Sequence, residues 1–322
     1  MAGRKDDWDE LAINKNRNRR KKTRRNKSKQ LDQDEIDARD FVGSLETATG
    51  KYDWMKEKRY KSIFRDIENK IQGAMGKGPF EWVDRRVFDQ VFDRLTLMSL
   101  YKLMKNEVID TVDFPVARGK EAHVFHGTDP QGKPVAIKIF HTSNAVFKNL
   151  MQYIEGDQRF GGLRRRHRDL VDIWVRKEQR NLARLAKWGL CVPKPLGLNK
   201  NVLVMEYLGD DTSPYPKLRE VLVENPQEVL DELLQFLAVS WQKANLVHGD
   251  FSPFNILWSN DGPVVIDVGQ AVIQSHPKAQ EFLIRDVTRL VEWANKNGIG
   301  IDLAEAMYEV LNMDLSHVIE EV

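Results

Sequence analysis

The chain has 322 residues, 41% of them hydrophobic, which is enough for one large domain or two smaller ones with a real core. No apolar run approaches the length of a membrane span and the N-terminus is polar, so we expect a cytoplasmic protein with no membrane partner. The single cysteine, Cys191, excludes an intrachain disulfide and a cysteine metal site, and its apolar neighbours predict a small core residue.

The net charge of +2 conceals an uneven distribution of charges along the chain. Residues 14–29 contain ten Lys or Arg and no acidic residue, whereas residues 32–40 are acidic. Such a block cannot bury enough apolar surface to fold alone, which predicts a disordered basic arm over residues 1–46. The interleaved Asn, Ser and Thr suit contacts with nucleic-acid phosphates; the alternative is a solvated tail that binds nothing specific.

A helical extension is expected over residues 47–106, and its strongest periodicity lies in residues 84–106. There Val87, Val91, Leu95 and Met98 share one face, which predicts an amphipathic helix.

Alternation over residues 112–140 predicts two or three antiparallel strands, with a hairpin turn at 129–132. The second strand of that hairpin carries Lys138 in a Val-Ala-Ile-Lys sequence, where protein kinases place the lysine that pairs with nucleotide phosphates. The turn Gly119-Lys120-Glu121 would cover the phosphates, although it is neither a Walker loop nor a full G-x-G-x-x-G. The alternative for Lys138 is an edge-strand lysine that discourages aggregation.

A periodic helix is predicted from about Val171 to Trp188, with Glu178 in its middle. Glu178 could form the ion pair that orients Lys138, or it could belong to a solvated helical face together with Lys177 and Arg180. Residues 201–209 then predict a buried strand that runs into a linker, whose backbone would bond the adenine of a nucleotide.

A helix predicted over residues 227–245 leads into a sequence in which Asp250, Asn255 and Asp267 lie between short apolar runs. In the protein-kinase layout, an Asp accepts the hydroxyl proton, while an Asn five residues later and an Asp after the next strand hold Mg²⁺. Because Mg²⁺ is commonly held by one or two protein oxygens together with phosphates and water, this pair of ligands suffices. The alternative is an ordinary Asx-rich turn between two strands.

Helices are also expected over residues 280–297 and 303–312. The order of elements predicts an α+β, two-lobed protein-kinase-like fold, with a small antiparallel sheet and helix in residues 107–204 and a hinge and larger, mostly helical lobe in residues 205–322. A ligand site is expected between the lobes.

From about residue 108 to residue 290 the chain resembles the RIO-type atypical serine/threonine protein kinases, and the first RIO subfamily more than the second. The motifs that carry the resemblance are the 119–125 loop (similar to GKEA-x-V-[YF]), the strand 136–139, the Lys-Glu-x-x-Asn-Leu helix at 177–182, the hinge 203–207, the segment 266–270 (similar to IDVSQ), and Arg285-Asp286.

Two departures from the family pattern bear on function. Phe251 and Pro253 differ from the usual H-[AG]-D-L-S-[ED]-[YF]-N, and Ala117-Arg118 replaces a Ser-Thr pair. The resulting H-G-D-x-x-P-x-N also resembles aminoglycoside and choline phosphotransferases, so a small-molecule phosphotransferase is the alternative function, although the GKEA loop argues against it. A non-catalytic, RNA-binding pseudokinase is a third hypothesis, and the intact set of catalytic residues argues against that one.

The resemblance implies ATP and Mg²⁺, with Mn²⁺ as a substitute, as cofactors. It implies Asp250, Asp267 and Lys138 as catalytic residues and Asn255 and Asp267 as metal ligands. The residues expected to bind ATP are Gly119, Lys120, Glu121, Val124, Ala136, Lys138, Glu178, Met205, Glu206, Tyr207, Leu208, Leu257 and Ile266.

No Ala-Pro-Glu follows Asp267, which agrees with the family's lack of an ordinary activation segment. The family is associated with small ribosomal subunit maturation and with ATP hydrolysis through an aspartyl-phosphate on the metal-binding Asp. That association would give residues 14–29 a partner in ribosomal RNA or a pre-ribosomal particle.

Overall fold

The computed structural model describes residues 61–71, 91–142, 151–157, 159, 167–210 and 213–320. The chain divides into two units, residues 1–60 and 61–322, and every described residue belongs to the second. The predicted basic arm over residues 1–46 lies outside the described residues, and so do residues 47–60 and 72–90 of the predicted helical extension.

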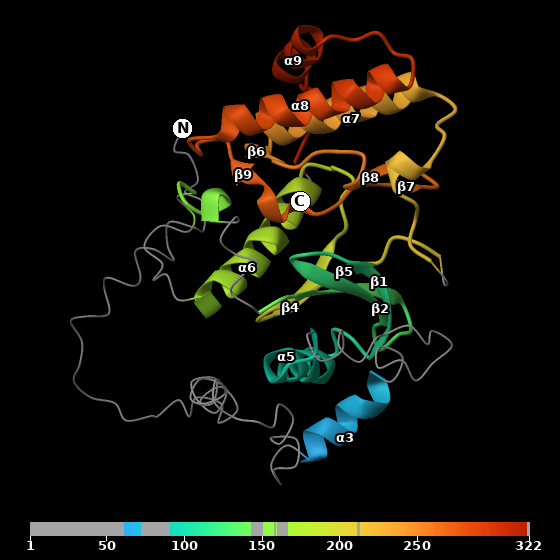
Figure 1. Ribbon diagram of the computed structural model, residues 1–322, viewed down its shortest axis with the longest axis vertical. Helices are drawn as coiled ribbons and strands as arrows, with labels where there is room; N and C mark the ends of the chain where they lie inside the picture. Colours follow the sequence, from blue (N-terminus) through green and yellow to red (C-terminus); the bar gives the residue numbers. More distant parts are fainter. Residues whose placement is uncertain are drawn as a thin grey trace, which may run out of the picture. The chain divides into compact units, whose positions relative to one another are not determined.

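The first lobe is built on a five-stranded antiparallel sheet with the strand order β1-β2-β3-β5-β4 (Figure 1). Its strands are β1 (Thr111–Arg118), β2 (Ala122–Thr128), β3 (Pro134–Phe140), β4 (Pro195–Asn199) and β5 (Val202–Glu206). Lys138 lies in the central strand, β3, where it pairs with Val124 of β2 and Leu203 of β5. The edge-strand alternative for Lys138 is therefore wrong.

The hairpin between β2 and β3 turns at the predicted place. The Asp129 carboxylate accepts hydrogen bonds from the backbone N–H groups of Gln131 and Lys133, both at 2.9 Å. Gly132 has a φ of 79°, a conformation that a glycine adopts without steric cost. An aspartate that bonds its own turn and a glycine in the left-handed region together fix the register of the two strands.

Helix α5 (Arg94–Lys105) is shorter than the helix predicted over residues 84–106. Phe92 and Asp93 are not helical, and the Asp93 side chain accepts a hydrogen bond of 2.8 Å from the backbone N–H of Thr96. An N-cap of this kind begins a new helix, so the apolar periodicity that continues through Val91 does not imply a continuous helix. α3 (Lys61–Lys70) precedes this region and contacts both α5 and β1.

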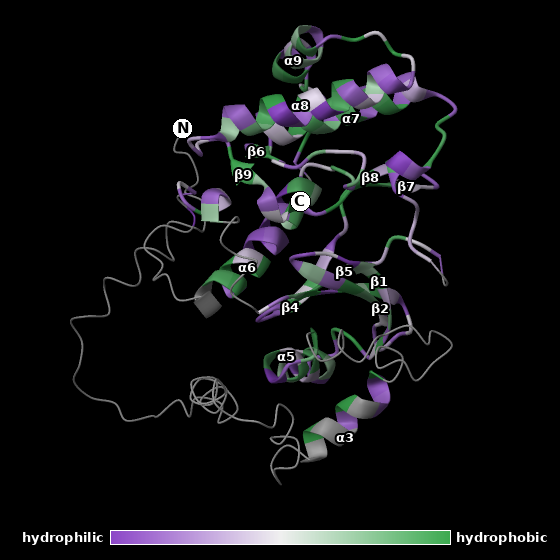
Figure 2. Ribbon diagram, in the orientation of Figure 1, coloured by the Kyte–Doolittle hydropathy of each residue, from purple (hydrophilic) through white to green (hydrophobic). Residues whose placement is uncertain are grey.

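The second lobe is mostly helical. It consists of α7 (Pro226–Gln242), α8 (Ala279–Lys296) and α9 (Leu303–Asn312), together with two short strand pairs, β6 (Leu246–Val247) with β9 (Val272–Ile273) and β7 (Ile256–Ser259) with β8 (Gly262–Val265). Apolar and polar residues alternate along α7 and α8 (Figure 2), and the apolar ones, such as Leu233 and Phe282, are buried. The three helices predicted in this part of the chain are confirmed with boundaries displaced by at most a few residues.

One helix, α6 (His167–Ala186), contacts both lobes. It packs on β4 and β5 of the sheet and on η7 (Val268–Gln270), a 3-10 turn of the second lobe that follows Asp267. Its apolar residues Trp174, Leu182 and Leu185 are buried, as their helical spacing predicts. The fold is α+β and two-lobed, with α6 joined to both parts.

Cys191 is exposed, so the prediction of a core cysteine is wrong. It lies in the chain between α6 and β4, where its backbone carbonyl accepts a hydrogen bond of 2.9 Å from Val265 N. Within the described ranges, no helix is both long and apolar enough to cross a membrane.

Candidate active site

The Lys138 ammonium lies between two carboxylates that come from different parts of the chain. Its Nζ is 2.6 Å from Glu178 Oε1 on α6 and 2.9 Å from Asp267 Oδ1, which follows β8. Burial alone would lower the pKa of Lys138, but the charges of Asp267 and Glu178 outweigh it and raise the pKa above its usual value. A lysine held charged in this way can act as a fixed cation for an anionic ligand.

Glu178 is 1% exposed, so the prediction of a solvated helical face is wrong for this residue. It is equally wrong for Lys177, the preceding residue, which is fully buried. Burial raises the pKa of Glu178, whereas the Lys138 ammonium lowers that of Asp267. As the pH falls, Glu178 therefore takes up a proton before Asp267 does.

Asp267 has a left-handed backbone, with φ 61° and ψ 55°, which is uncommon for a residue other than glycine. Its side chain is 47% exposed although its partner Lys138 is buried. Only Oδ1 bonds within the described part of the chain, so Oδ2 is left for a ligand. Strained residues of this kind are often found at functional sites.

Asp250 and Asn255 are joined to each other in the loop between β6 and β7. Asn255 Nδ2 donates to the Asp250 carbonyl at 2.9 Å and to Asp250 Oδ2 at 3.1 Å. The other carboxylate oxygen, Oδ1, forms an ion pair with Arg289 of α8. Because the Asn255 amide nitrogen turns toward Asp250, its Oδ1 is the atom left to contact a cation.

A buried histidine connects this loop with the residue before Asp267. His248 Nδ1 accepts a hydrogen bond of 3.2 Å from the Asp250 backbone N–H, so Nε2 is the nitrogen that donates to the Ile266 carbonyl at 3.1 Å. That pattern defines the neutral imidazole with its proton on Nε2. His248 therefore holds the backbones around Asp250 and Asp267 at a fixed separation.

The same loop is anchored from α8 by Asp286, which is fully buried. Its carboxylate accepts hydrogen bonds from the backbone N–H groups of Gly249, at 2.7 Å, and Phe251, at 2.9 Å. The guanidinium of Arg285 donates to the Gly249 carbonyl. Two neighbouring residues of α8 thus fix the backbone on both sides of Asp250.

Glu121, in the turn between β1 and β2, completes the acidic side of the site. Burial and the charges of Asp267, Glu178 and Asp250 together raise the pKa of its carboxyl to about 7, against the opposing charge of Lys138. These interactions place the predicted phosphate-covering turn in the electrostatic field of the residues that would hold a nucleotide.

We expect Glu121→Gln to change the pH dependence of stability. A folded-state pKa of about 7, against an ordinary value of 4.5, means that the protonated carboxyl stabilises the fold below about 4.5 and that this contribution is lost as the pH rises through 7. The nucleotide-free variant should melt at the wild-type temperature at pH 5 and several degrees higher at pH 8, as measured by differential scanning fluorimetry. Glu281→Gln, at an exposed glutamate of α8, is the control; equal shifts in both variants would contradict the assignment.

The site contains oxygen donors suited to Mg²⁺. Within the described residues, no three His, Cys, Asp or Glu side chains are grouped as a metal cage. Mg²⁺ commonly retains water and substrate phosphates and takes only one or two protein ligands, so Asp267 Oδ2 and Asn255 Oδ1 fit it.

The remaining residues predicted to bind ATP lie on neighbouring strands and turns. Val124 pairs with Lys138, and Ala136 pairs with Met205, across adjacent strands. Both Met205 and Glu206 are still within β5, so the linker begins only at Tyr207 and Leu208. Leu257 lies in β7, while Gly119 and Lys120 lie in the β1–β2 turn. The ATP-binding roles of these residues stay predictions.

Sequence reasoning missed several residues that contact the site. Arg289 appears in the sequence as one more charged residue of an amphipathic helix, and only the fold brings it to Asp250. Lys177 and Asn181 stood in the Lys-Glu-x-x-Asn-Leu motif, and their spacing of four residues placed them on one helical face. That spacing indicates from sequence that the two side chains share a face of the helix, but it does not show what the face contacts.

A two-lobed fold with a Lys–Glu ion pair beside an Asp, and an Asp–Asn pair five residues apart, defines the class of protein-kinase-like phosphotransferases. Comparison with known proteins gives the family. The RIO1 family profile, described as the RIO domain, matches residues 123–306. The chain belongs to the RIO family of atypical serine/threonine protein kinases.

Among curated relatives, the chain is 38% identical over 229 residues to the RIO-type serine/threonine-protein kinase Rio1 of Haloferax volcanii, covering 71% of this chain and 78% of that protein. It is 34% identical over 239 residues to serine/threonine-protein kinase RIO1 of Homo sapiens, covering 73% of this chain and 42% of that protein. The match thus spans less than half of the human relative.

A crystal structure of a Rio2 kinase-ADP/Mg²⁺-phosphoaspartate complex from Chaetomium thermophilum superposes with a TM-score of 0.54 at 21% identity, covering 69% of this chain and 67% of that one. At that identity the likeness supports the fold alone.

Proposed function

We propose that this kinase catalyses Mg²⁺·ATP-dependent phosphoryl transfer at the site formed by Lys138, Asp250, Asn255 and Asp267. The observation that carries the proposal is the connection of Lys138 to both Glu178 and Asp267, at 2.6 and 2.9 Å, beside a bonded Asp250–Asn255 pair. Phosphoryl transfer depends on positioning and charge neutralisation, and these residues supply fixed charges of both signs.

Each residue has a separate role in the proposed reaction. The Lys138 ammonium neutralises and orients the phosphates, and Glu178 keeps that ammonium in place. Asn255 Oδ1 and Asp267 Oδ2 would hold Mg²⁺, which supplies charge neutralisation on the phosphate oxygens when bound. The Asp250 carboxylate would accept the proton of the attacking hydroxyl or water.

Asp267 is also the proposed phosphoryl acceptor. Its carboxylate oxygen would attack the γ-phosphorus as the bond to the β,γ-bridging oxygen breaks, leaving ADP and an acyl phosphate. Attack by water oriented by Asp250 would then release inorganic phosphate and regenerate the carboxylate. The Rio2 kinase-ADP/Mg²⁺-phosphoaspartate complex supports this proposal. The early start of α8 at Ala279 supports it too, because it leaves little chain after Asp267 for an activation segment.

The test is an assay of the purified full chain with γ-labelled ATP and Mg²⁺. We expect release of free phosphate and a phosphoprotein that is labile to hydroxylamine, because an acyl phosphate reacts with that nucleophile and a phosphoserine does not. Rapid transfer to an aminoglycoside or to choline would instead support a small-molecule phosphotransferase, and absence of turnover with retained RNA binding would support a pseudokinase.

We also propose that the protein acts in the cytoplasm in small ribosomal subunit maturation and that residues 14–29 bind ribosomal RNA or a pre-ribosomal particle. The support is the ten Lys or Arg without an acidic residue in that stretch and the family association. A dense positive charge block attracts a polyanion by release of counterions.

For this arm we expect a strong salt dependence of RNA affinity. The logarithm of the affinity for a single-stranded RNA should fall with the logarithm of salt concentration by about 0.7 for each phosphate contact. Deleting residues 1–40 should flatten the slope and leave ATP hydrolysis nearly unchanged, as measured by fluorescence anisotropy and phosphate release. Equal slopes with and without residues 1–40 would show that the arm does not contribute.

A further inference from the structure

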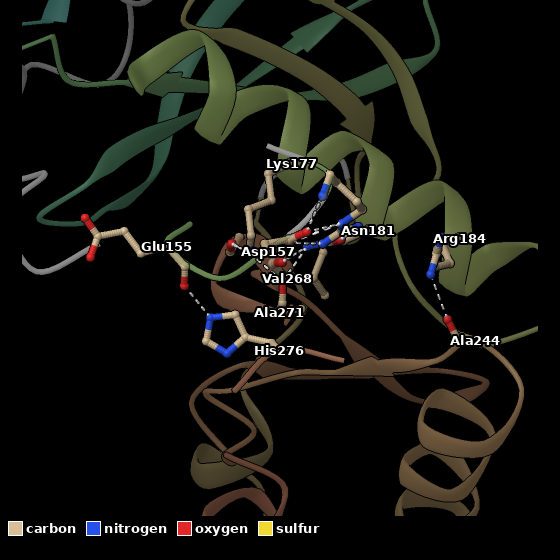
Figure 3. Close-up of polar contacts among 11 residues, drawn as sticks. Glu155, Asp157, Lys177, Asn181, Arg184, Ala244, Val268, Ala271 and His276 are labelled. Carbon is tan, nitrogen blue, oxygen red and sulfur yellow. Dashed lines mark hydrogen bonds and ion pairs between the residues drawn. The ribbon is translucent and has the colours of Figure 1, made fainter. Parts of the chain in front are cut away.

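Helix α6 carries a row of side-chain donors that point at backbone carbonyls of the second lobe. Lys177, Asn181 and Arg184 follow one another at i, i+4 and i+7, which places them on one face of the helix. Lys177 donates to the carbonyls of residues 269 and 271, Asn181 to those of residues 268 and 271, and Arg184 to that of residue 244 (Figure 3). The helix is thus hydrogen-bonded across to the second lobe along two turns.

Lys177 is an unusual donor because it is fully buried and its hydrogen-bond acceptors are carbonyls, not carboxylates. Nζ lies 2.7 Å from the Gly269 carbonyl, contacts the Ala271 carbonyl, and sits 5.3 Å from the centre of the Trp174 ring. Burial, together with the nearby charge of Arg159, lowers the pKa of Lys177 to about 7, because a charged ammonium is costly to bury without a paired carboxylate. A core that needed only packing would be satisfied by a methionine of similar length, so the hydrogen bonds to residues 269 and 271 are the feature that distinguishes a lysine here.

Asn181 uses both ends of its amide. Its Nδ2 donates to the Val268 carbonyl at 2.9 Å and to the Ala271 carbonyl at 3.1 Å, and its Oδ1 accepts from Arg159 Nη1 at 2.9 Å. Arg159 is itself held by the buried Asp157 carboxylate, with Nη2 at 2.7 Å from Oδ2. This second layer fixes the orientation of the amide, so that the donor end and not the acceptor end faces the carbonyls.

The carbonyls that Lys177 and Asn181 hold belong to three of the four residues directly after Asp267, namely Val268, Gly269 and Ala271. The approach is close, because a β-carbon at Gly269 would lie 3.1 Å from both Glu178 Oε2 and Trp174 Nε1. Asp267 itself has the left-handed backbone that turns its carboxylate to Lys138. Fixing the carbonyls of residues 268, 269 and 271 therefore restricts the backbone that sets the direction of the Asp267 side chain.

We propose that Lys177 and Asn181 are positioning residues for phosphoryl transfer, and that they hold Asp267 in its metal-binding orientation by clamping residues 268–271 to α6. The same helix places Lys138 through Glu178, one residue after Lys177. One rigid element thereby sets both the cation and the carboxylate that face the phosphates. The inference rests on the proposed function in one respect only, namely that Asp267 is a Mg²⁺ ligand.

The hydrogen bonds of Lys177 and Asn181 also bear on how the site is regulated. In protein kinases that use an activation segment, the helix bearing the glutamate is a control point because its position decides whether the Lys–Glu pair forms. Here α6 cannot move away from the second lobe without breaking the hydrogen bonds of Lys177 and Asn181. The Lys138–Glu178 pair is thus kept assembled without a phosphorylation event.

The test uses the full chain with the variants Lys177→Met and Asn181→Asp. Methionine keeps the length of the side chain without its donors, and aspartate keeps the shape and the contact with Arg159 but presents oxygens to the carbonyls. The measurement is the ratio of ADP dissociation constants without and with Mg²⁺, by calorimetry, which needs no turnover. Groups that orient a metal ligand typically contribute 10- to 100-fold to metal affinity, so we expect each variant to reduce the Mg²⁺ enhancement at least tenfold while metal-free ADP binding stays within about twofold.

The control is Gln242→Met, which removes a hydrogen bond of the same kind, from Gln242 Nε2 to the Val310 carbonyl at 2.8 Å, between α7 and α9. It should leave the Mg²⁺ enhancement at the wild-type value. If a folded Lys177→Met or Asn181→Asp protein kept the same Mg²⁺ enhancement as the wild type, the clamp would be overturned. It would also be overturned if the wild-type protein bound ADP equally well with and without Mg²⁺. Wild-type protein that binds Mg²⁺·ADP but does not turn over ATP would instead contradict the proposed function and leave the clamp to be decided by the same ratios.

Discussion

Replacing Asp250 by alanine is expected to lower ATP turnover by about two to four orders of magnitude, the usual range for the loss of a general base, while Mg²⁺·ATP still binds. In the proposed site the phosphates are bound by Lys138 and, through Mg²⁺, by Asp267, and the hydrogen bonds described for these two side chains do not involve Asp250. Asp250 instead bonds Asn255 and Arg289 and is one third exposed. Its removal leaves Arg289 in contact with solvent, so little stability should be lost.

The measurements are single-turnover rates, nucleotide affinity by calorimetry, and the melting temperature. Asp302→Ala is the control: Asp302 is an exposed carboxylate that caps α9 by accepting a hydrogen bond of 2.8 Å from Glu305 N. That variant should lose about 1 kcal/mol of stability and none of its turnover. A large fall in the melting temperature of Asp250→Ala together with loss of nucleotide binding would show that Asp250 has a structural role.

The periodic helices of the second lobe could be predicted from sequence because the spacing of their apolar residues indicates both the helix and its approximate ends. α9 occupies residues 303–312 as predicted, and α7 and α8 differ from prediction by only a few residues at their ends. The start of α5 could not be obtained in the same way, because the apolar period runs through Phe92 and Asp93 without a break. There a single side-chain hydrogen bond, from Thr96 N to Asp93, decides where the helix begins.

The residues of the candidate site also fall into two groups, those that the sequence indicates and those that only the fold reveals. A kinase-like spacing indicates Lys138, Asp250, Asn255 and Asp267 because their order along the chain reflects the order of the strands that carry them. The contacts that orient these residues join positions far apart in sequence, such as Arg289 with Asp250 and Lys177 with Gly269. On an isolated helix, a buried lysine and a solvated lysine have the same sequence pattern, so only the tertiary structure separates them.

Asp267→Asn is expected to abolish formation of the phosphoenzyme altogether. Asparagine has the shape of aspartate but has no carboxylate to attack phosphorus, and it loses the ion pair of 2.9 Å with Lys138. Lys138 keeps its pair with Glu178, at 2.6 Å, so the ammonium is still neutralised and the fold should be retained. Mg²⁺ affinity should fall as well, because an amide oxygen is a weaker ligand than a carboxylate for a hard cation.

The phosphorylated residue can be identified by chemical reduction followed by mass spectrometry. Borohydride reduces an aspartyl-phosphate to homoserine, so mass spectrometry of wild-type protein treated with Mg²⁺·ATP and then reduced should find homoserine at position 267, and the Asp267→Asn protein should contain none. Asp261→Asn, at an exposed aspartate of the β7–β8 turn, should give as much homoserine at position 267 as the wild type. Acid-stable phosphoserine without homoserine at position 267 would mean that Asp267 serves only as a metal ligand and that the chain phosphorylates itself as an ordinary kinase does.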